Sequence, residues 1–184
     1  ASGYWISESL QNVLDVTVPL SAATADEAYD RIADQLATPE LRPRALFERF
    51  GIEVLATTDD PLDDLAGHAA LAAEGAVGRV LPTFRPDRYL DPDAAGFAQN
   101  VERLVAETGS PGTFAGYLAA LEQRRRYFIE HGAVSADHGV EVPDTLDLAP
   151  EEGEGLFARV VSGDADAGER HSFRAHMLLS LIHI

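Results

Sequence analysis

The sequence contains no cysteine, so disulfide bonds and thiolate metal sites are excluded. The absence of cysteine suits a cytoplasmic protein, and the cytoplasm is the expected compartment. Basic residues are few, because 14 Lys and Arg stand against 31 Asp and Glu, a net charge of -17 at pH 7. A field this negative repels phosphate backbones and anionic lipids. We therefore expect neither a nucleic acid nor a membrane as a partner.

Several familiar motifs are also missing. No apolar run approaches the roughly 20 residues that a membrane-spanning helix needs. The first residues lack the basic region and apolar stretch of a secretory signal. The sequence has no His-x-His, no His-Glu-x-x-His, no phosphate-binding glycine loop and no Gly-x-Ser-x-Gly. Motifs alone therefore show no complete catalytic site.

Helical patterns alternate with short β-compatible runs along the 184 residues. Residues 1–23 have no clear period and are expected to form an irregular or helical lead-in. The period predicts helices over residues 25–36, 38–50, 61–75, 91–108, 113–131, 150–161 and 165–179. A short buried strand is predicted over residues 52–56, and two further short strands over residues 79–83 and 133–136. Strands separated by helices favour parallel pairing with right-handed crossovers.

The predicted fold class is α/β, a partial TIM-type (β/α) barrel with three parallel strands and long helical connections. Three strands are too few to close such a barrel. We therefore expect residues 1–184 to be a single partial domain, the middle portion of a barrel. The apolar residues 180–184 carry no stop signal and are expected to be a truncation edge.

Local signals add four narrower predictions. Thr24, followed by Glu27, has the pattern of a capping box. Asp60 before Pro61 has the pattern of a helix N-cap before a proline at the first helical position. The run 124–126 of three arginines is expected to be a solvated helix face. His68 lies within a predicted helix, where a surface or capping role is the expectation.

Polar residues follow each predicted strand, and in a β/α barrel the carboxyl ends of the strands open onto the active site. Arg85 follows the second strand, and Pro86 after it holds Arg85 in an extended conformation. A guanidinium fixed at a strand end can clamp a substrate carboxylate through two parallel hydrogen bonds. The alternative is an ion pair between Arg85 and Asp87 that only shapes a loop.

The other two strand ends supply the remaining candidates. Asp137 and His138 follow the third strand, where the imidazole could serve acid–base or metal chemistry, or could only hydrogen-bond a loop that Gly139 allows to turn. Thr58 and Asp59 follow the first strand and could face a polar, hydroxylated ligand. No residue of this segment is assigned a catalytic or a metal-binding role.

Four segments of the sequence resemble the uronate isomerase (glucuronate isomerase) family, namely residues 42–50, 55–65, 82–87 and 137–139. Tyr127-Phe128 ahead of His131-Gly132 also matches this family. The resemblance runs in the family's order over about residues 24–179. It implies an amidohydrolase-like metal barrel that converts D-glucuronate to D-fructuronate and D-galacturonate to D-tagaturonate. The implied reaction moves a proton between C1 and C2 of the open-chain sugar acid, with a divalent metal, expected to be zinc, polarising nearby oxygens.

Residue by residue, the resemblance implies that Arg85 holds the uronate carboxylate or neighbouring oxygens. It implies that Asp137 and His138 line the site, with Thr58 and Asp59 at the preceding strand end. The family's metal-binding His-x-His belongs to the first barrel strand and its metal-binding Asp to the last, and neither motif occurs here. The metal ligands are therefore expected outside this chain, the segment is expected to be inactive alone, and a homo-oligomer is compatible with the sequence.

Two alternatives remain open. The first is another metal-dependent barrel of the amidohydrolase type, a hydrolase that uses the same Arg85, Asp137 and His138 at the mouth of its barrel. The second is a non-enzymatic, acidic helical module that binds a protein partner.

Overall fold

The computed structural model describes residues 2–75 and 78–183. The chain divides into two compact units, Ala1–Glu53 and Val54–Ile184. All five predicted site residues belong to the second unit. The prediction of a single partial domain stays a prediction. No helix in the described part of the chain is long and apolar enough to cross a membrane.

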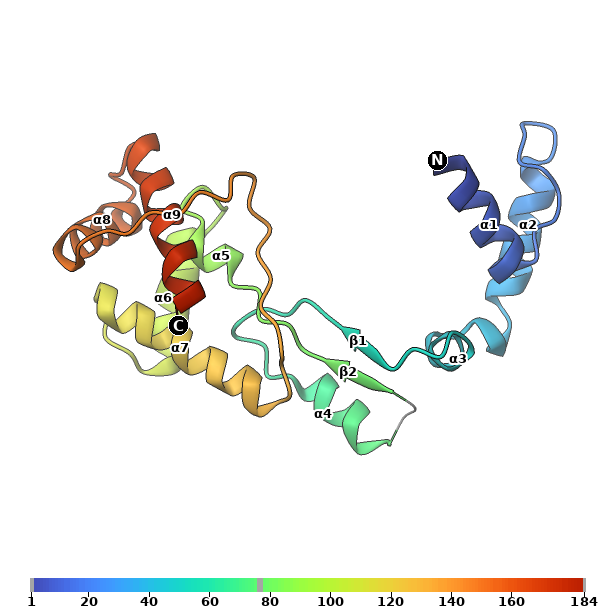
Figure 1. Cartoon of the computed structure of the whole chain (residues 1–184), viewed down its shortest axis with the longest axis horizontal. Helices are drawn as coiled ribbons and strands as arrows, with labels where there is room; N and C mark the ends of the chain where they lie inside the picture. The colour runs from blue at the N-terminus through green and yellow to red at the C-terminus, as the bar shows by residue number, and fades with distance from the viewer. Residues whose placement is uncertain (1, 76–77, 184) are drawn as a thin grey trace. The chain divides into compact units, whose positions relative to one another are not determined.

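The first unit consists of helices (Figure 1). They are α1 (Ser2–Leu14), α2 (Ala25–Leu36), the 3-10 turn η1 (Pro39–Leu41) and α3 (Pro43–Arg49). The lead-in predicted over residues 1–23 is therefore helical for most of its length. Arg49 of α3 ties this helix to α1, because its guanidinium donates to the carbonyl of Asn12 at 2.8 Å.

Two local predictions in this unit were wrong in detail. The helix predicted over residues 38–50 breaks in two, because Pro43 pushes Arg42 into an extended conformation with φ -66° and ψ 148°. The predicted helix start at Thr24 is confirmed, but its capping box is not. The Thr24 hydroxyl instead donates to the Pro19 carbonyl at 2.5 Å and accepts from the Ser21 amide at 3.0 Å.

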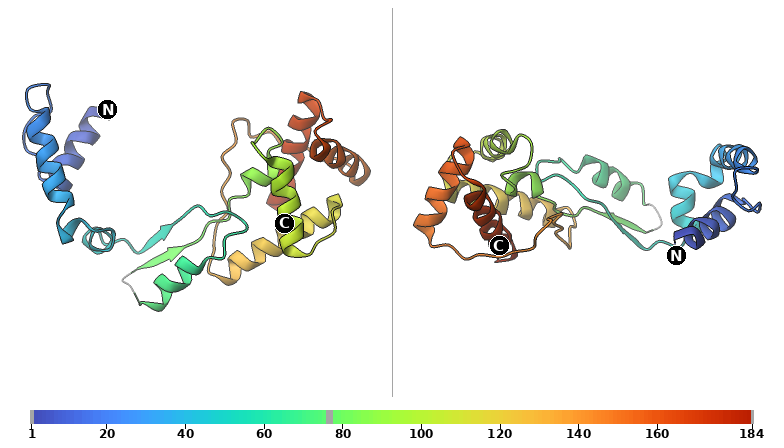
Figure 2. Two further views of the ribbon diagram at one scale, coloured as in Figure 1. Left: turned by 180° about the vertical axis from the view of Figure 1, so that it is seen from behind. Right: turned by 90° about the horizontal axis from the view of Figure 1, so that it is seen from above.

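In the second unit, β1 (Val54–Ala56) and β2 (Arg79–Leu81) form a parallel sheet. Val54 stands opposite Arg79 and Ala56 opposite Leu81. Helix α4 (Ala66–Ala73) connects the two strands and lies beside them (Figures 1 and 2). The parallel pairing predicted from the strand–helix–strand order is confirmed. The predicted burial of the first strand is wrong, because among the described residues β1 pairs on one edge only and its side chains are exposed.

Beyond the strands the ladder continues through single parallel bridges, Asp59 to Phe84 and Phe84 to Ala136. The third strand predicted over residues 133–136 is thus reduced to one bridge. Only every second residue of the second strand end hydrogen-bonds to the segment around Ala136. The next such residues before and after Phe84 are Pro82 and Pro86. Proline has no N–H to donate, so Pro86 cannot extend the ladder past Asp137, and Pro82 can offer only its carbonyl to the segment up to Ser135.

The helix predicted over residues 61–75 begins only at Ala66. Three aspartates in the preceding segment accept from backbone amides two residues further on. The bonds run from Leu62 to Asp60 at 2.9 Å, from Leu65 to Asp63 at 2.6 Å and from Ala66 to Asp64 at 2.9 Å. Such short acidic side chains satisfy the backbone in turns and so delay helix formation. Asp60 therefore closes a turn and is not the helix N-cap.

The remaining helices pack together beyond the carboxyl ends of the strands (Figures 1 and 2). An aromatic cluster forms their core, with the ring of Phe157 centred 5.5 Å from that of Phe114 and 5.1 Å from that of Tyr117.

The helices predicted over 113–131 and 150–161 are confirmed, the one over 91–108 starts later, and the one over 165–179 continues to His183. The helices are α5 (Asp87–Leu90), α6 (Phe97–Thr108), α7 (Phe114–Glu130), α8 (Pro150–Ser162) and α9 (Ala167–His183).

The arginine run on α7 is not simply a solvated face. Arg124 donates to the carbonyls of Pro61 at 2.5 Å and Asp63 at 2.8 Å. Arg125 donates to the Leu181 carbonyl at 2.8 Å. These charge-assisted bonds hold the turn after β1 and the end of α9 against α7.

Candidate functional site

The bridges bring the three predicted strand ends side by side. Asp59, Phe84 and Ala136 form one row across them, called here the strand-end row. The connection after α7 passes the carboxyl ends of β1 and β2 in both Figure 1 and Figure 2. Arg85 and Asp137 each follow this row by one residue, and Thr58 precedes it by one. The tertiary structure therefore brings the three strand ends that carry the predicted site residues next to one another.

The row has two faces, because successive side chains of an extended chain point to opposite sides. Phe84 points toward the helices, since its ring packs edge-on against Phe128 of α7 with centroids 5.2 Å apart. Arg85 and Asp137, each one residue later, leave from the other side. Their Nη2 and Oδ2 atoms lie 3.0 Å apart. We call the first side the helix face and the second the Arg85 face.

Asp59 belongs to the helix face. Its Oδ2 accepts from the Thr57 hydroxyl at 2.7 Å and from the Thr83 amide at 3.2 Å. The same hydroxyl lies 2.8 Å from Nε2 of His68 on α4. His68, expected to have a surface or capping role, thus faces the sheet and helps to hold α4 against it. The structure brings Asp59 to the strand ends but turns its carboxylate away from Arg85.

Hydroxyl groups lie on the Arg85 face. The side chain of Thr58 is exposed, and alternation along the strand puts it on this side. The hydroxyls of the buried Thr83 and the exposed Ser135 lie 3.2 Å apart, two residues ahead of Arg85 and Asp137 respectively. These two residues were missed as candidates. The two-residue period counted back from Arg85 and Asp137 is the signal that could have found them.

Arg85 is shared between two carboxylates. Its Nε lies 3.3 Å from Oδ2 of Asp87, and its Nη2 lies 3.0 Å from Oδ2 of Asp137. The loop-shaping ion pair with Asp87 therefore exists alongside the contact across the strand ends. Oδ2 of Asp87 also accepts from the Gly139 amide at 2.8 Å, and Oδ1 lies 3.4 Å from Nδ1 of His138. Arg85, Asp137 and His138 are thus brought into one cluster, with Asp87 at its centre.

The electrostatics of this cluster limit what it can bind. One guanidinium stands beside two carboxylates, so an added anion gains less than it would from an isolated arginine. The Arg85 side chain is nevertheless 41% exposed, and its two remaining N–H donors on Nη1 make no hydrogen bond within the described residues. A planar fork with free donors, on the same face as the exposed side chains of Thr58 and Ser135, suits a hydroxylated acid.

The helix that follows Arg85 is anchored by Tyr89. Its hydroxyl donates to Oδ1 of Asp60 at 2.8 Å, and its carbonyl accepts from the buried Tyr117 hydroxyl at 2.6 Å. Burial, together with the hydrogen bond to the Asp60 carboxylate, raises the pKa of Tyr89 well above its usual range. Tyr89 therefore stays a neutral donor and connects the turn after β1 to α5, where Asp87 lies.

The divalent metal that the resemblance implies finds no ligand set in this segment. Among residues 2–75 and 78–183 no group of three His, Asp or Glu side chains is arranged to hold a metal ion. Asp87, Asp137 and His138 come nearest, but the Arg85 guanidinium lies among their carboxylates. A second cation there would be repelled by Arg85. These residues do not fit a metal site, and no metal-dependent step is assigned to them.

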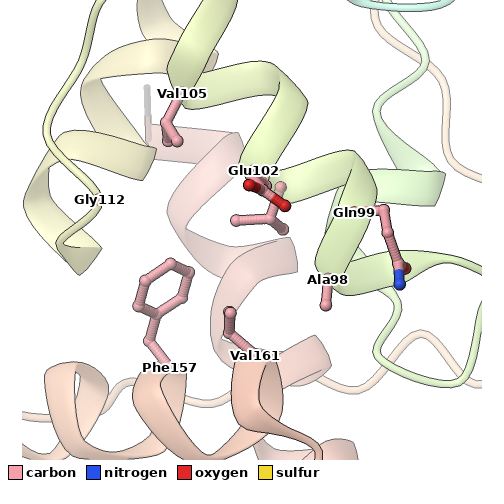
Figure 3. A pocket seen from close by; sticks show the side chains of 8 residues that line it. Ala98, Gln99, Glu102, Val105, Gly112, Phe157 and Val161 are labelled. Carbon is pink, nitrogen blue, oxygen red and sulfur yellow. The ribbon is translucent and has the colours of Figure 1, made fainter.

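A hollow elsewhere in the second unit does not suit a sugar acid. It encloses ≈ 340 Å³ between α6 and α8, and Figure 3 shows the ring of Phe157 pointing into it. Its walls are mainly apolar, with Val105 and Val161 close by and Gln99 at one edge (Figure 3). None of the predicted site residues lines it. The strand-end row therefore remains the candidate site.

Known proteins resemble this chain in sequence over nearly its whole length. A sequence model of the glucuronate isomerase family matches residues 3–184. The uronate isomerase of Rhizorhabdus wittichii is 51% identical over 178 residues, which cover 96% of this chain and 38% of that protein. The uronate isomerase of Corynebacterium efficiens is 46% identical over 180 residues, again 96% of this chain and 38% of that protein.

Solved structures of the family have the same backbone arrangement. The crystal structure of glucuronate isomerase from Caulobacter crescentus aligns with a TM-score of 0.89 and 40% sequence identity, over 98% of this chain and 38% of that one. Uronate isomerase from Thermotoga maritima aligns with a TM-score of 0.87 and 28% identity, over 98% and 40% of the two chains. The chain thus spans about two fifths of the length of the relatives it matches. It belongs to the glucuronate isomerase family.

Proposed function

We propose that this segment is part of a uronate isomerase, an aldose–ketose isomerase that converts D-glucuronate to D-fructuronate and D-galacturonate to D-tagaturonate. The observation that carries the proposal is the strand-end row. In a chain of this family, it presents the Arg85 guanidinium and the exposed side chains of Thr58 and Ser135 on the face that points away from α4 and α7. A polyhydroxylated acid is the ligand that such a face suits. The proposed location of the enzyme is the cytoplasm.

In this proposal the sheet is one section of a TIM-type (β/α) barrel. The strands β1 and β2 and the bridged segment at residues 135–137 are three successive positions of that barrel. The helix face then points to the outer helical layer, and the Arg85 face points to the barrel mouth. Solved relatives that align over 98% of this chain at TM-scores of 0.89 and 0.87 support this arrangement.

The residues of this chain bind and orient the substrate. Arg85 holds the uronate carboxylate through the free donors on Nη1, while Asp87 and Asp137 fix the plane of the guanidinium. Asp137, His138 and Thr58 line the same face and contact the sugar hydroxyls. Asp59 contributes from the helix face by holding the strand end. A bound divalent metal, which we propose is zinc, would polarise the sugar oxygens, with ligands supplied from outside this chain.

Replacement of Arg85 tests this assignment. In a full-length isomerase that carries this segment, Arg85→Met should reduce kcat/KM for D-glucuronate and D-galacturonate by the equivalent of about 2–5 kcal/mol. The physical reason is the loss of a charge-assisted contact to the substrate carboxylate. The matched control is Arg88→Met, because Arg88 lies three residues away and pairs with Asp60 at 3.1 Å on an exposed surface. That variant should keep nearly full activity.

Each result has a clear consequence. Equal kinetics for the Arg85 and Arg88 variants would remove Arg85 from the site. Hydrolysis of amides or lactones by the unmodified full-length protein, without uronate isomerisation, would favour the hydrolase alternative. An in-frame His-x-His upstream and an Asp-x-Arg downstream of this coding region would supply the metal ligands that the proposal requires.

A further inference from the structure

Asp87 joins two of the strand ends. It is the first residue of α5 and lies two residues after Arg85. Its Oδ2 atom lies 3.3 Å from Arg85 Nε and accepts from the Gly139 amide at 2.8 Å. Arg85 and Gly139 belong to chain segments that are distant in sequence. A single carboxylate therefore sets the position of the guanidinium relative to the turn that carries His138.

The other oxygen of Asp87 has an incomplete contact. Oδ1 is buried and faces the buried Nδ1 atom of His138 at 3.4 Å. Neither atom makes a well-formed hydrogen bond to any residue that the structure describes. Buried polar atoms in folded proteins are nearly always paired, so such a pair calls for an explanation. Hydrogen bonds in active sites are often long without substrate and shorten when it binds.

The contact determines which imidazole nitrogen is available. An ionised carboxylate oxygen can only accept, so the contact is favourable when His138 carries a hydrogen on Nδ1. Nε2 is then the nitrogen left for a ligand, and it makes no hydrogen bond within the described residues. Carboxylates orient imidazoles in this way in many catalytic sites.

The neighbouring Asp137 differs from Asp87 in one useful respect. Both carboxylates contact the Arg85 guanidinium, at distances of 3.3 and 3.0 Å. Only Asp87 also contacts the His138 side chain. Asp137 is therefore a matched control for any effect that Asp87 exerts through the imidazole.

We propose that Asp87 is a positioning residue of the substrate site. It orients the guanidinium of Arg85 and keeps a hydrogen on Nδ1 of His138. The free donors on Arg85 Nη1 and the Nε2 atom of His138 are thereby presented together to one sugar acid. This inference rests on the proposed function and adds to it a residue that, from the sequence, had only a loop-shaping role.

A double-mutant cycle tests the proposal in a full-length isomerase that carries this segment. Asp87→Asn and His138→Gln should each lower kcat/KM for D-glucuronate by about 10- to 100-fold, the usual effect of losing an orienting contact at a histidine. In the His138→Gln background, Asp87→Asn should have an effect at least about fivefold smaller, because its route through the imidazole is already gone. Asp137→Asn should lower kcat/KM by the same factor in both backgrounds.

Two results would overturn the inference: normal kinetics for His138→Gln, or an Asp87→Asn effect that is equal in both backgrounds, as a purely structural role would produce. If Arg85→Met also keeps wild-type kinetics, the proposed site fails as a whole. If Arg85→Met is impaired while Asp87→Asn lowers kcat/KM by the same factor with and without His138→Gln, only the role of Asp87 fails.

Folding of the variants is checked by the midpoint of thermal unfolding. Asp87→Asn is a mild change, because the asparagine oxygen can still accept from the Gly139 amide. If Asp87→Asn does not fold, Asp87→Glu takes its place, since it keeps the charge but displaces the carboxylate by one methylene. The same reduced effect in the His138→Gln background is expected of it, and an equal effect in both backgrounds would contradict the proposal.

Discussion

The two faces of the strand-end row differ in how their polar groups are satisfied. On the helix face, Phe84 is 2% exposed and Asp59 is held by Thr57 and a backbone amide. On the Arg85 face, the guanidinium is 41% exposed and keeps free donors. Adjacent residues of one short segment thus serve separate purposes. The helix face fixes the strand ends, and the Arg85 face is left available to a ligand.

The strongest test of this comparison is a truncation on the helix face. Phe128→Ala removes the ring that packs on Phe84, and Phe128 is 0% exposed. We expect the free energy of unfolding to fall by about 3–5 kcal/mol, because a buried aromatic side chain leaves a cavity. Urea denaturation of a full-length protein carrying this segment measures the change.

The control for this truncation is the next residue along the helix. Ile129 is 59% exposed, so Ile129→Ala should change stability by less than about 0.5 kcal/mol. Similar losses for the two variants would show that Phe84 is not held through α7. The distinction between the two faces would then lose its structural basis.

A pair of adjacent threonines gives a more selective test. Thr57→Val removes the hydroxyl between Asp59 and His68, and should cost about 1–3 kcal/mol of stability because a part-buried carboxylate loses a donor. Thr58→Val changes the exposed Arg85 face, and should raise KM for D-glucuronate by the equivalent of about 0.5–1.5 kcal/mol with little change in stability. Urea denaturation and steady-state kinetics separate the two effects.

The threonine pair can also contradict the comparison. A raised KM in Thr57→Val at unchanged stability would place Asp59 and its partners in contact with substrate. A loss of stability in Thr58→Val, with normal KM, would show that the Arg85 face is structural.

The smallest effect is expected at an ion pair away from both faces. The hydrogen bond from Arg170 lowers the pKa of Asp93. Partial burial opposes this shift, and the hydrogen bond from Arg174 reinforces it. Because the pKa of Asp93 is lower in the folded state than in the unfolded state, the ion pair stabilises the protein at pH values above the ordinary Asp pKa of about 4. This stabilisation is lost as the pH falls through the folded-state pKa. At an exposed site the contribution should be about 0.2–1 kcal/mol.

Unfolding free energies at pH 7 and near pH 2 measure this contribution. Asp93→Asn should destabilise the protein at pH 7 and have almost no effect in acid. In an Arg170→Met background, the destabilisation that Asp93→Asn causes at pH 7 should be smaller, because the carboxylate has already lost its main partner. An equal effect of Asp93→Asn at both pH values would mean that the ion pair adds nothing.

Much of the arrangement follows from local patterns. The parallel pairing of β1 with β2 could be predicted because each strand is short, apolar and separated by a helical pattern. Arg85 could be placed at a strand end because Pro86 forbids helix at that residue. Helices α7 and α8 agree with their predicted ranges because a Thr113 cap and a first-turn proline mark their starts.

Other features could not be predicted because they depend on distant partners. The side to which Asp59 turns depends on its bridge to Phe84, and the contact of Thr57 with His68 requires α4 to pack against the sheet. The surface role expected for Arg124 failed because carbonyls of the turn after β1 lie within its reach. Pro86, which ends the third pairing, was visible in the sequence, but its effect depends on which residues of the second strand end face that segment.

By itself, the sequence determined which chemical groups stand at the strand ends and which family the chain belongs to, because motif order and strand–helix alternation are local properties. Only the tertiary structure decided which of these groups face one another. It turned the Asp59 carboxylate to the face opposite the Arg85 side chain and placed Asp87 against His138. The physical reason is that side-chain direction follows from the register between distant segments, and a one-residue change of register would exchange the two faces.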